Sequence, residues 1–324
     1  MKKIAIIGAG QLGSRHLQGI AQSNFDITIE VVEPFEASRK VAEERYEEIL
    51  DTTHVKKIDF FDNISLLSDE LDLVIVATSS DVRSAVIKEL LSLKNVENLV
   101  LEKVLFQTIS EYEEIDELLS QTNTFCWVNH PRRMFPFYQE LQKELSKANQ
   151  ISYNVQGGDW GLGCNGLHFL DHLSFLVDSS DIKIEHQSLD NILYESKRKG
   201  FIEFGGVLSG RIGEHSFSLH SIQYNSVALL TIVSDVMALK INETAGIIEV
   251  ARASEDWIWK TIEEKIVYYQ SELSQIIIED ILVKNVTSLP TYKEAKSLHI
   301  PFLTALLAKM EEITGETSER CPIT

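Results

Sequence analysis

The chain has 324 residues, of which 44% are hydrophobic and 24% are charged. This balance is typical of folded globular proteins and excludes disordered and collagen-like chains, and at roughly 100–200 residues per domain the length predicts two domains. Acidic residues outnumber basic ones by 49 to 30, which gives a net charge of −19. A surface this negative repels phosphate backbones and anionic lipids, so we expect no nucleic-acid or membrane partner.

Cysteine usage and the N-terminus indicate the compartment. Cys126, Cys164 and Cys321 are odd in number and lack CxxC spacing, which supports neither a disulfide framework nor a metal site. The apolar stretch Ile4–Ile7 is too short for a signal peptide, and no apolar run approaches the ~20 residues that span a bilayer. We therefore expect a cytoplasmic protein without a metal.

Short apolar runs alternate with helical patterns over the first 130 residues. The predicted strands are Ile4–Ile7, Thr28–Val32, Leu73–Ala77, Leu99–Leu101 and Phe125–Asn129. The predicted helices are Leu12–Gln22, Glu36–Leu50, Ser84–Leu93 and Ser110–Leu119. Because strands that alternate with helices form βαβ units around a parallel sheet, residues 1–130 are predicted to form a doubly wound, Rossmann-type α/β domain.

The pattern changes after Pro136. A predicted helix at about Tyr138–Lys147 precedes several β-rich segments, and an amphipathic helix at Lys293–Ile313 comes last. The β-rich segments are Ile151–Gln156, Ile192–Tyr194, Gly200–Phe204, Ser216–Ile222, Ala228–Val233 and Met237–Ile241. Strands in close succession favour antiparallel pairing, so residues 131–324 are predicted to form an α+β domain with a large, mostly antiparallel sheet.

A glycine pattern follows the first strand. Gly8-Ala9-Gly10-Gln11-Leu12-Gly13 fits G-x-G-x-x-G, in which the first glycine permits a tight turn, the second a close approach of backbone to a pyrophosphate, and the third helix–strand packing. Glu33 ends the second strand about 20 residues after Gly13, as a ribose-binding acid does. Its carboxylate would accept the ribose hydroxyls and repel a 2′-phosphate. The pattern predicts a dinucleotide site that prefers NAD over NADP.

The motifs along the chain resemble those of the Gfo/Idh/MocA family, the group of glucose–fructose oxidoreductase and inositol dehydrogenase. The glycine pattern continues to His16, as in that family's GxGxxGxxH opening. Later segments are similar to its A-T-x-x, E-K-P, R-R-F-x-P and H-x-x-D motifs: Ala77-Thr78-Ser79-Ser80, Glu102-Lys103-Val104, Arg132-Arg133-Met134-Phe135-Pro136 and His168-Phe169-Leu170-Asp171. Val104 stands in place of the proline.

The resemblance implies a Rossmann domain followed by an α/β domain whose open sheet often mediates oligomerisation, here a homo-dimer or homo-tetramer. It also implies hydride transfer with a nicotinamide cofactor, to which Thr78, Ser79 and Glu102 would contribute contacts. An ammonium at Lys103 could polarise a substrate oxygen, although lysine is most often a solvated surface residue. Glu102 could hold the ribose, position the lysine or be a surface partner.

His168 is the candidate proton acceptor, because imidazole titrates near neutral pH. Asp171, three residues later, falls on the same helical face and could orient it. The plainer alternative is that His168 and His172 are core histidines bonded to carbonyls.

Two positions depart from the family pattern. Cys164 stands where an Asp is common, four residues before His168, and a thiol replaces a carboxylate poorly because its reference pKa is ~8.5. Asp159 or Asp171 could supply the missing carboxylate. Pro131 stands where an Asn is frequent, which weakens the transfer of that loop's cofactor contacts.

Three further residues are candidates for the substrate pocket. Trp160 lies in a glycine-rich segment, where it could offer an apolar face to a sugar. Arg132 and Arg133 could hold an anionic group of the substrate, since a guanidinium pairs carboxylate or phosphate in a bidentate manner. A structural salt bridge is the alternative for both arginines.

The sequence thus predicts an NAD-dependent oxidoreductase that transfers hydride to or from a carbinol carbon of a sugar, cyclitol or nucleotide-sugar. One alternative uses transient oxidation for elimination or hydrolysis of a glycoside. Another, motivated by Cys164, is a cofactor-binding regulatory protein without catalysis. Fold alone does not decide among these readings.

Overall fold

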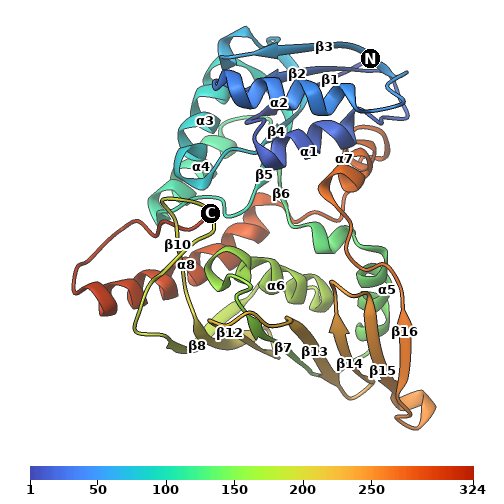
Figure 1. Cartoon of the computed structure of the whole chain (residues 1–324), viewed down its shortest axis with the longest axis vertical. Coiled ribbons are helices and arrows are strands. Elements are labelled where there is room, and N and C mark those ends of the chain that lie inside the picture. The colour runs from blue at the N-terminus through green and yellow to red at the C-terminus, as the bar shows by residue number, and fades with distance from the viewer. The chain divides into compact units, whose positions relative to one another are not determined.

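The computed structural model describes residues 1–324, which form two compact units (Figure 1). Unit 1 comprises Met1–Phe106, Ser110–Pro131 and Tyr268–Tyr292. Unit 2 comprises Gln107–Ile109, Arg132–Val267 and Lys293–Thr324. No helix is both long enough and apolar enough to span a membrane.

Unit 1 is built on a six-stranded parallel sheet with the strand order β3-β2-β1-β4-β5-β6. The strands are β1 (Lys2–Ile7), β2 (Ile27–Val32), β3 (Val55–Phe61), β4 (Glu70–Val76), β5 (Asn95–Glu102) and β6 (Phe125–Asn129). The helices are α1 (Gln11–Ile20), α2 (Glu36–Glu47), α3 (Ser80–Leu93) and α4 (Ile109–Ser120). The predicted Rossmann fold is confirmed, although the sequence patterns did not single out β3, which is only partly buried.

The strand order reverses between β1 and β4, which pair in the middle of the sheet. Their residues are apolar on both sides because helices cover both faces, and Ile4, Ile6, Leu73 and Ile75 are fully buried. In open α/β sheets, ligands bind where the carboxyl ends of the strands meet this reversal. The glycine turn and Thr78 both lie at that edge.

One helix of unit 1 comes from far along the chain. Helix α7 (Gln270–Glu279) returns after the second sheet and packs beside α1 (Figure 1). The packing is close, since a Cβ on Gly19 would lie 2.7 Å from the Ser271 carbonyl oxygen. The predicted domains, 1–130 and 131–324, place α7 in the second domain. No local sequence pattern indicates that a helix will pack against another helix some 250 residues earlier in the chain.

Unit 2 contains an eight-stranded sheet with the order β16-β15-β14-β13-β7-β12-β11-β8. Its strands are β7 (Ile151–Gly158), β8 (Ile182–Leu189), β11 (Gly206–Ile212), β12 (His215–Ile222), β13 (Leu229–Ser234), β14 (Met237–Asn242), β15 (Ile247–Arg252) and β16 (Lys260–Glu263). The pairs are antiparallel except β7 with β12, so the predicted mostly antiparallel sheet is confirmed. A short hairpin of β9 (Tyr194–Glu195) and β10 (Ile202–Glu203) stands apart.

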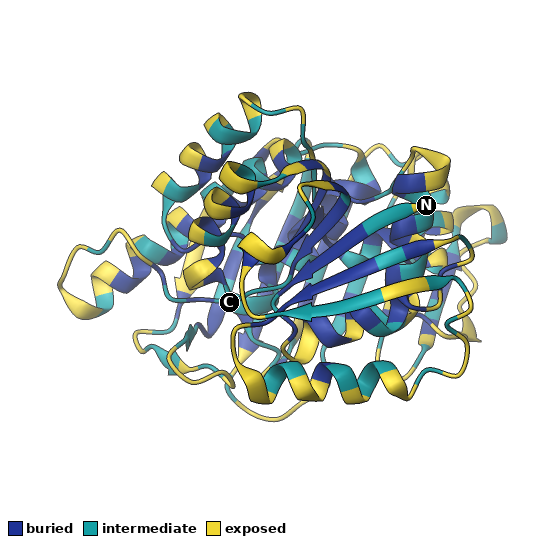
Figure 2. Cartoon of the chain, turned by 90° about the horizontal axis from the view of Figure 1, so that it is seen from above, coloured by how far each residue is buried: buried dark blue, intermediate teal, exposed yellow.

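Helices α5 (Pro136–Leu145), α6 (Leu162–Val177) and α8 (Tyr292–Thr314) lie over one face of this sheet (Figure 1). Burial alternates accordingly: Phe217 and Leu219 are buried, whereas Ser218 and His220 between them are half-buried on the open face. Figure 2, which looks onto unit 1, shows the inner strands of its sheet buried and the outer sides of its helices exposed. Helix α6 is buried along most of its length, and it carries the candidate residues Cys164, His168 and Asp171.

Candidate functional site

The glycine turn has the geometry of a phosphate cradle. Gly8 has a φ of +89°, and a Cβ on Gly13 would lie 1.8 Å from the Gly8 carbonyl oxygen, so neither tolerates a side chain. A Cβ on Gly10 would meet nothing within 4 Å. The backbone at Gly10 is therefore open to a ligand at the N-terminus of α1, where the helix presents N–H groups and a partial positive charge.

Glu33 lies against this turn. It is 5% exposed, and its carboxylate accepts hydrogen bonds from the backbone N–H of Ala9 at 2.8 Å and of Phe35 at 3.1 Å. The side chain is thus held beside the glycine loop, where a ribose-binding acid belongs. Glu33 is therefore not a solvent-exposed glutamate at the end of a strand.

A basic side chain also reaches the turn. The Arg45 guanidinium, from α2, donates to Gln11 Oε1 at 2.7 Å and to the Ser14 hydroxyl. It places a cation next to the predicted pyrophosphate site. Sequence reasoning missed Arg45, because only the fold brings α2 beside the first turn of α1.

The segment after β4, which contains Thr78 and Ser79, lies at the same edge of the parallel sheet as the glycine turn. Thr78 packs against Gly8, and its buried hydroxyl oxygen has no hydrogen-bond partner. Ser79 precedes the first turn of α3. Together with the open backbone at Gly10, the Thr78 hydroxyl leaves polar atoms for a dinucleotide to satisfy. The residues present therefore fit a nicotinamide dinucleotide.

Glu102 ends β5 inside a buried hydrogen-bond network. Its Oε1 lies 2.8 Å from His16 Nε2 and accepts from Asn129 Nδ2 at 2.5 Å, and His16 Nδ1 lies 2.9 Å from the Ser274 hydroxyl. Burial raises the pKa of Glu102, but the hydrogen bond and charge of His16 more than offset it, so the pKa lies below its usual value. Glu102 is 3% exposed and is not a surface partner.

Lys103 follows Glu102 at the carboxyl edge of the parallel sheet and is half-buried. The peptide bond between Lys103 and Val104 is cis. The buried guanidinium of Arg83 donates to the carbonyls of Thr78, Val104 and Leu105. Arg83 thereby ties the segment that carries Lys103 to the segment that carries Thr78.

Helix α6, in unit 2, carries the half-buried Cys164 and His168 one turn apart. Glu203 caps the N-terminus of this helix. Its carboxylate accepts hydrogen bonds from the backbone N–H of Gly163 at 2.7 Å and of Cys164 at 3.1 Å. A negative charge is favourable at a helix N-terminus. The Cys164 thiol lies 3.9 Å from the Ser196 hydroxyl. Sequence reasoning missed Glu203, which lies 39 residues from Cys164 along the chain.

Asp171 points into a buried ion pair. Its carboxylate accepts from Arg133 Nε at 3.0 Å and from a terminal guanidinium nitrogen at 2.8 Å, with 0% and 8% of the two side chains exposed. Burial raises the pKa of Asp171 to about 6, against the opposing charge of Arg133. The structure thus brings together two candidates that the sequence assigned to separate roles.

Arg132 makes the neighbouring pair. Its guanidinium donates to Glu243 at 2.9 and 2.6 Å, and the Tyr138 hydroxyl donates to the same carboxylate at 2.5 Å. Burial raises the pKa of Glu243, but Arg132 more than offsets this and leaves the pKa low. Both arginines therefore make salt bridges, the alternative that the sequence left open. Glu243 gives no local signal, since it lies 111 residues from Arg132.

The aromatic candidate joins the same region of unit 2. The Trp160 ring packs edge-on against Phe169 at 5.4 Å, and Arg132 lies 4.2 Å above the Phe169 ring. The Trp160 indole N–H donates to the His220 carbonyl at 3.0 Å. Asp159, by contrast, is exposed and lies 3.6 Å from Lys197.

His172 is fully buried and belongs to the core. Its Nδ1 lies 2.9 Å from the Tyr153 hydroxyl, its ring centre lies 3.9 Å from that of Tyr138, and its Nε2 has no partner. Burial, with the nearby charge of Arg132, lowers its pKa to about 3. The ring is therefore neutral at physiological pH. His172 is a core histidine, which is the second alternative that the sequence left open.

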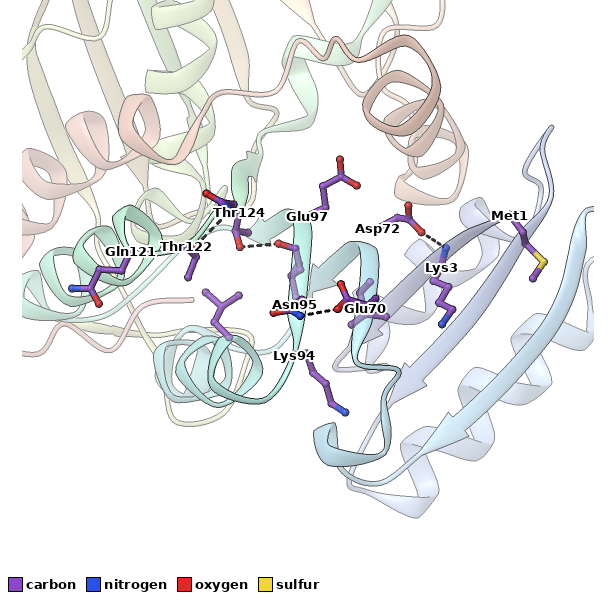
Figure 3. A pocket seen from close by; sticks show the side chains of 14 residues that line it. Met1, Lys3, Glu70, Asp72, Lys94, Asn95, Glu97, Gln121, Thr122 and Thr124 are labelled. Atoms are coloured by element: carbon purple, nitrogen blue, oxygen red, sulfur yellow. Dashed lines mark hydrogen bonds between the residues drawn. The ribbon is translucent and has the colours of Figure 1, made fainter.

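A polar hollow of about 590 Å³ lies at the other edge of the unit 1 sheet (Figure 3). It is lined at the amino ends of the strands, by residues that include Lys3, Asp72, Asn95 and Thr124. The carboxyl ends of parallel strands share the opposite edge, so this hollow is separate from the glycine turn. No group of three or more His, Cys, Asp or Glu side chains is arranged to hold a metal.

Comparisons with known proteins agree with this geometry. Residues 2–130 match the model of the Gfo/Idh/MocA oxidoreductase family with an NAD-binding Rossmann fold. No curated protein matches the chain by sequence.

Solved structures match nearly the whole chain. A Gfo/Idh/MocA family oxidoreductase from Vibrio cholerae is 18% identical, with a TM-score of 0.70, over 98% of this chain and 100% of its own. A super-repressor mutant of Gal80p from Saccharomyces cerevisiae is 14% identical, with a TM-score of 0.72, over 98% and 97%. UDP-N-acetylglucosamine 3-dehydrogenase from Acidithiobacillus ferrooxidans is 12% identical, with a TM-score of 0.69, over 96% and 98%.

At these identities the structural matches report the fold of the whole chain, while the sequence match is to the NAD-binding part. Residues 2–130 carry the glycine turn, Glu33 and the Glu102–Lys103 segment. Residues 2–130 thus match the NAD-binding Rossmann domain of the Gfo/Idh/MocA oxidoreductase family, and the whole chain shares its fold with solved structures that include a member of that family.

Proposed function

We propose that this protein is an NAD-dependent dehydrogenase or reductase that acts on a carbinol carbon of a sugar, cyclitol or nucleotide-sugar. The observation that carries the proposal is the contact of the Glu33 carboxylate with the backbone N–H of Ala9 at 2.8 Å. It holds an anionic hydrogen-bond acceptor beside an open glycine turn. A ribose with two free hydroxyls suits that acceptor, whereas a 2′-phosphate would meet its charge.

The chain's own residues divide the remaining work. NAD, when bound, supplies the hydride acceptor or, in its reduced form, the donor. The Lys103 ammonium polarises the substrate oxygen and stabilises the negative charge that develops on it. His168 takes the proton that leaves the carbinol, or returns it in the reverse direction. Arg83 and the Glu102 network are positioning groups, because they fix the backbone on either side of Lys103.

The proposed substrate class rests on an aromatic side chain of unit 2. The half-buried Trp160, held against the buried Phe169 ring, offers an aromatic face of the kind that packs against sugar rings, and the half-buried His168 precedes Phe169 on α6. We propose a homo-dimer or homo-tetramer in a reducing compartment such as the cytoplasm, in keeping with an odd number of unpaired cysteines.

The test is turnover, measured as NADH absorbance over a panel of sugars, cyclitols and nucleotide-sugars. Lys103→Ala and His168→Ala should lower turnover ~10²-fold or more, as removal of a charge stabiliser or general base does. NAD affinity should stay nearly unchanged, because neither residue lies in the glycine turn. Lys40→Ala and His54→Ala, both at exposed sites, are the matched controls. Equal turnover in all four variants would refute the assignment.

One observation favours a second function, a cofactor-binding regulator without catalysis. Cys164 occupies the position where the family commonly has Asp, Asp171 is held by Arg133, and Asp159 is exposed. If the wild type is inert across the panel while Cys164→Asp turns over, the regulator is the correct reading. A Cys164→Asp variant that lowers an existing activity supports the enzyme.

A further inference from the structure

Glu33 and Glu102 occupy equivalent places in the two halves of the unit 1 sheet. The strand order β3-β2-β1-β4-β5-β6 reverses between β1 and β4, so β2 in one half corresponds to β5 in the other. Glu33 directly follows β2, and Glu102 is the last residue of β5. Folds of this type are built from two mononucleotide-binding halves. Since Glu33 is the proposed acid for the adenosine ribose, Glu102 is the corresponding acid for the second ribose of a dinucleotide.

One carboxylate oxygen of Glu102 is held by the chain and the other is open. Oε1 lies 2.8 Å from His16 Nε2 and accepts a hydrogen bond from Asn129 Nδ2 at 2.5 Å. Oε2 accepts no hydrogen bond from the chain and is not fully enclosed. The carboxylate is thus fixed through one oxygen, and the other remains available to a ligand.

The contacts of Glu102 belong to a closed ring of five hydrogen-bonded side chains. From Glu102 the ring passes to His16, whose Nδ1 lies 2.9 Å from the Ser274 hydroxyl. Gln270 Nε2 donates to the Ser274 hydroxyl at 3.1 Å, and Gln270 Oε1 accepts from Asn129 at 2.8 Å. Asn129 closes the ring at Glu102. Two of the five members, Gln270 and Ser274, come from helix α7 (Figure 1).

Ser274 suits its place in the ring because a hydroxyl both donates and accepts. Its oxygen lies 2.8 Å from the Gln270 carbonyl oxygen as well as 2.9 Å from His16 Nδ1. The hydroxyl proton can therefore go to a neutral imidazole, or to the carbonyl when Nδ1 itself carries a proton. In both cases the Nε2–H of His16 stays directed at Glu102, since a carboxylate only accepts.

Given the dinucleotide site of the proposed function, we propose that Ser274 is a positioning residue for the cofactor. Through His16 it fixes the Glu102 carboxylate so that Oε2 accepts the hydroxyls of the second ribose. Ser274 is fully buried, so it acts through Glu102 and does not itself contact the dinucleotide. Helix α7 is thus part of the cofactor site, although it lies some 170 residues beyond Glu102 in the chain.

Isothermal titration with two fragments of the cofactor tests this role. ADP carries only the adenosine ribose, whereas ADP-ribose adds the second ribose, and the wild type should bind ADP-ribose more tightly. Ser274→Ala should weaken ADP-ribose binding ~10-fold, as loss of one hydrogen bond does, and leave ADP binding unchanged. The alanine keeps the Cβ that packs closely against Gly19. Ser271→Ala, at a half-buried site on the same helix, is the matched control and should bind both ligands as the wild type does.

Equal losses for ADP and ADP-ribose would mean that Ser274 only supports α1 and its glycine turn, and would overturn the proposal. So would Ser274→Ala binding that matches the wild type for both ligands. Glu102→Gln should by itself remove most of the advantage of ADP-ribose over ADP. Adding Ser274→Ala to that variant should change neither affinity further, because Ser274 acts through the carboxylate. A further loss of ADP-ribose binding in the double variant contradicts this route.

Nitrogen-15 NMR of the histidine side chains gives a second readout. In the wild type His16 Nε2 should carry a proton that exchanges slowly with solvent, and Ser274→Ala should make this exchange faster. An unchanged exchange rate would show that Ser274 does not hold the ring. None of these measurements involves turnover. A chain that gives all the expected results but oxidises or reduces no substrate refutes the proposed dehydrogenase alone, whereas an active wild type that binds ADP and ADP-ribose equally overturns the role of Ser274 alone.

Discussion

The buried His172 makes the stability of unit 2 depend on pH. The side chain is fully buried, and protonation would place a charge on a ring whose Nε2 has no acceptor, near Arg132. Its folded pKa of about 3 lies below the ordinary value of 6.5. Between these two values the unfolded chain binds a proton that the folded chain does not. The stability contributed by the neutral ring is therefore complete above pH 6.5 and is lost as the pH falls toward 3.

The magnitude follows from proton linkage at about 1.4 kcal/mol for each pH unit. Titration of the unfolded histidine lowers the free energy of unfolding by about 2 kcal/mol from pH 7 to pH 5, and by up to about 5 kcal/mol near pH 3. His172→Gln removes the titrating ring while keeping a polar partner for the Tyr153 hydroxyl. The variant should lose about 2 kcal/mol less than the wild type between pH 7 and pH 5.

Urea unfolding at the two pH values measures the difference. Three of the four tryptophans, Trp160, Trp257 and Trp259, belong to unit 2, so their fluorescence reports mainly on that unit. The exposed His186 supplies the control, and His186→Gln should follow the wild type. If His172→Gln shows the same pH dependence as the wild type, the ring is not held neutral by burial and the reasoning fails.

Three other changes test the site. Glu33→Ser should narrow the preference for NADH over NADPH, because it removes the negative charge that would face a 2′-phosphate. Fluorescence titrations measure both affinities, and a wild type that binds NADPH as tightly as NADH or more tightly would contradict the predicted preference. Asp171→Asn leaves the buried Arg133 guanidinium without its counter-charge and should cost about 3–5 kcal/mol of unfolding free energy in urea melts, and a loss below 1 kcal/mol would mean that water screens the pair. Gly13→Ala puts a Cβ 1.8 Å from the Gly8 carbonyl oxygen, so isothermal titration should find NAD binding abolished.

Local patterns in the sequence determined the order of elements in unit 1. Buried parallel strands are continuous apolar runs, and β4 was predicted at Leu73–Ala77 from that signal. The glycine turn could be predicted as well, because its backbone geometry admits no side chain at Gly8 or Gly13. Strands with mixed exposure, such as β3 and β16, carry no comparable signal and were not predicted.

Tertiary structure alone decided which polar groups meet. Arg133 and Asp171 lie 38 residues apart and Arg132 and Glu243 lie 111 apart, yet each pair forms a buried salt bridge. His16 contacts Ser274 across 258 residues. Such partners leave no periodicity in the chain, because a buried charge requires a counter-charge nearby in space and not nearby in sequence. The sequence by itself determined which backbone can bind a dinucleotide, and the packing of distant segments shifted the pKa values of Glu102, Asp171 and His172.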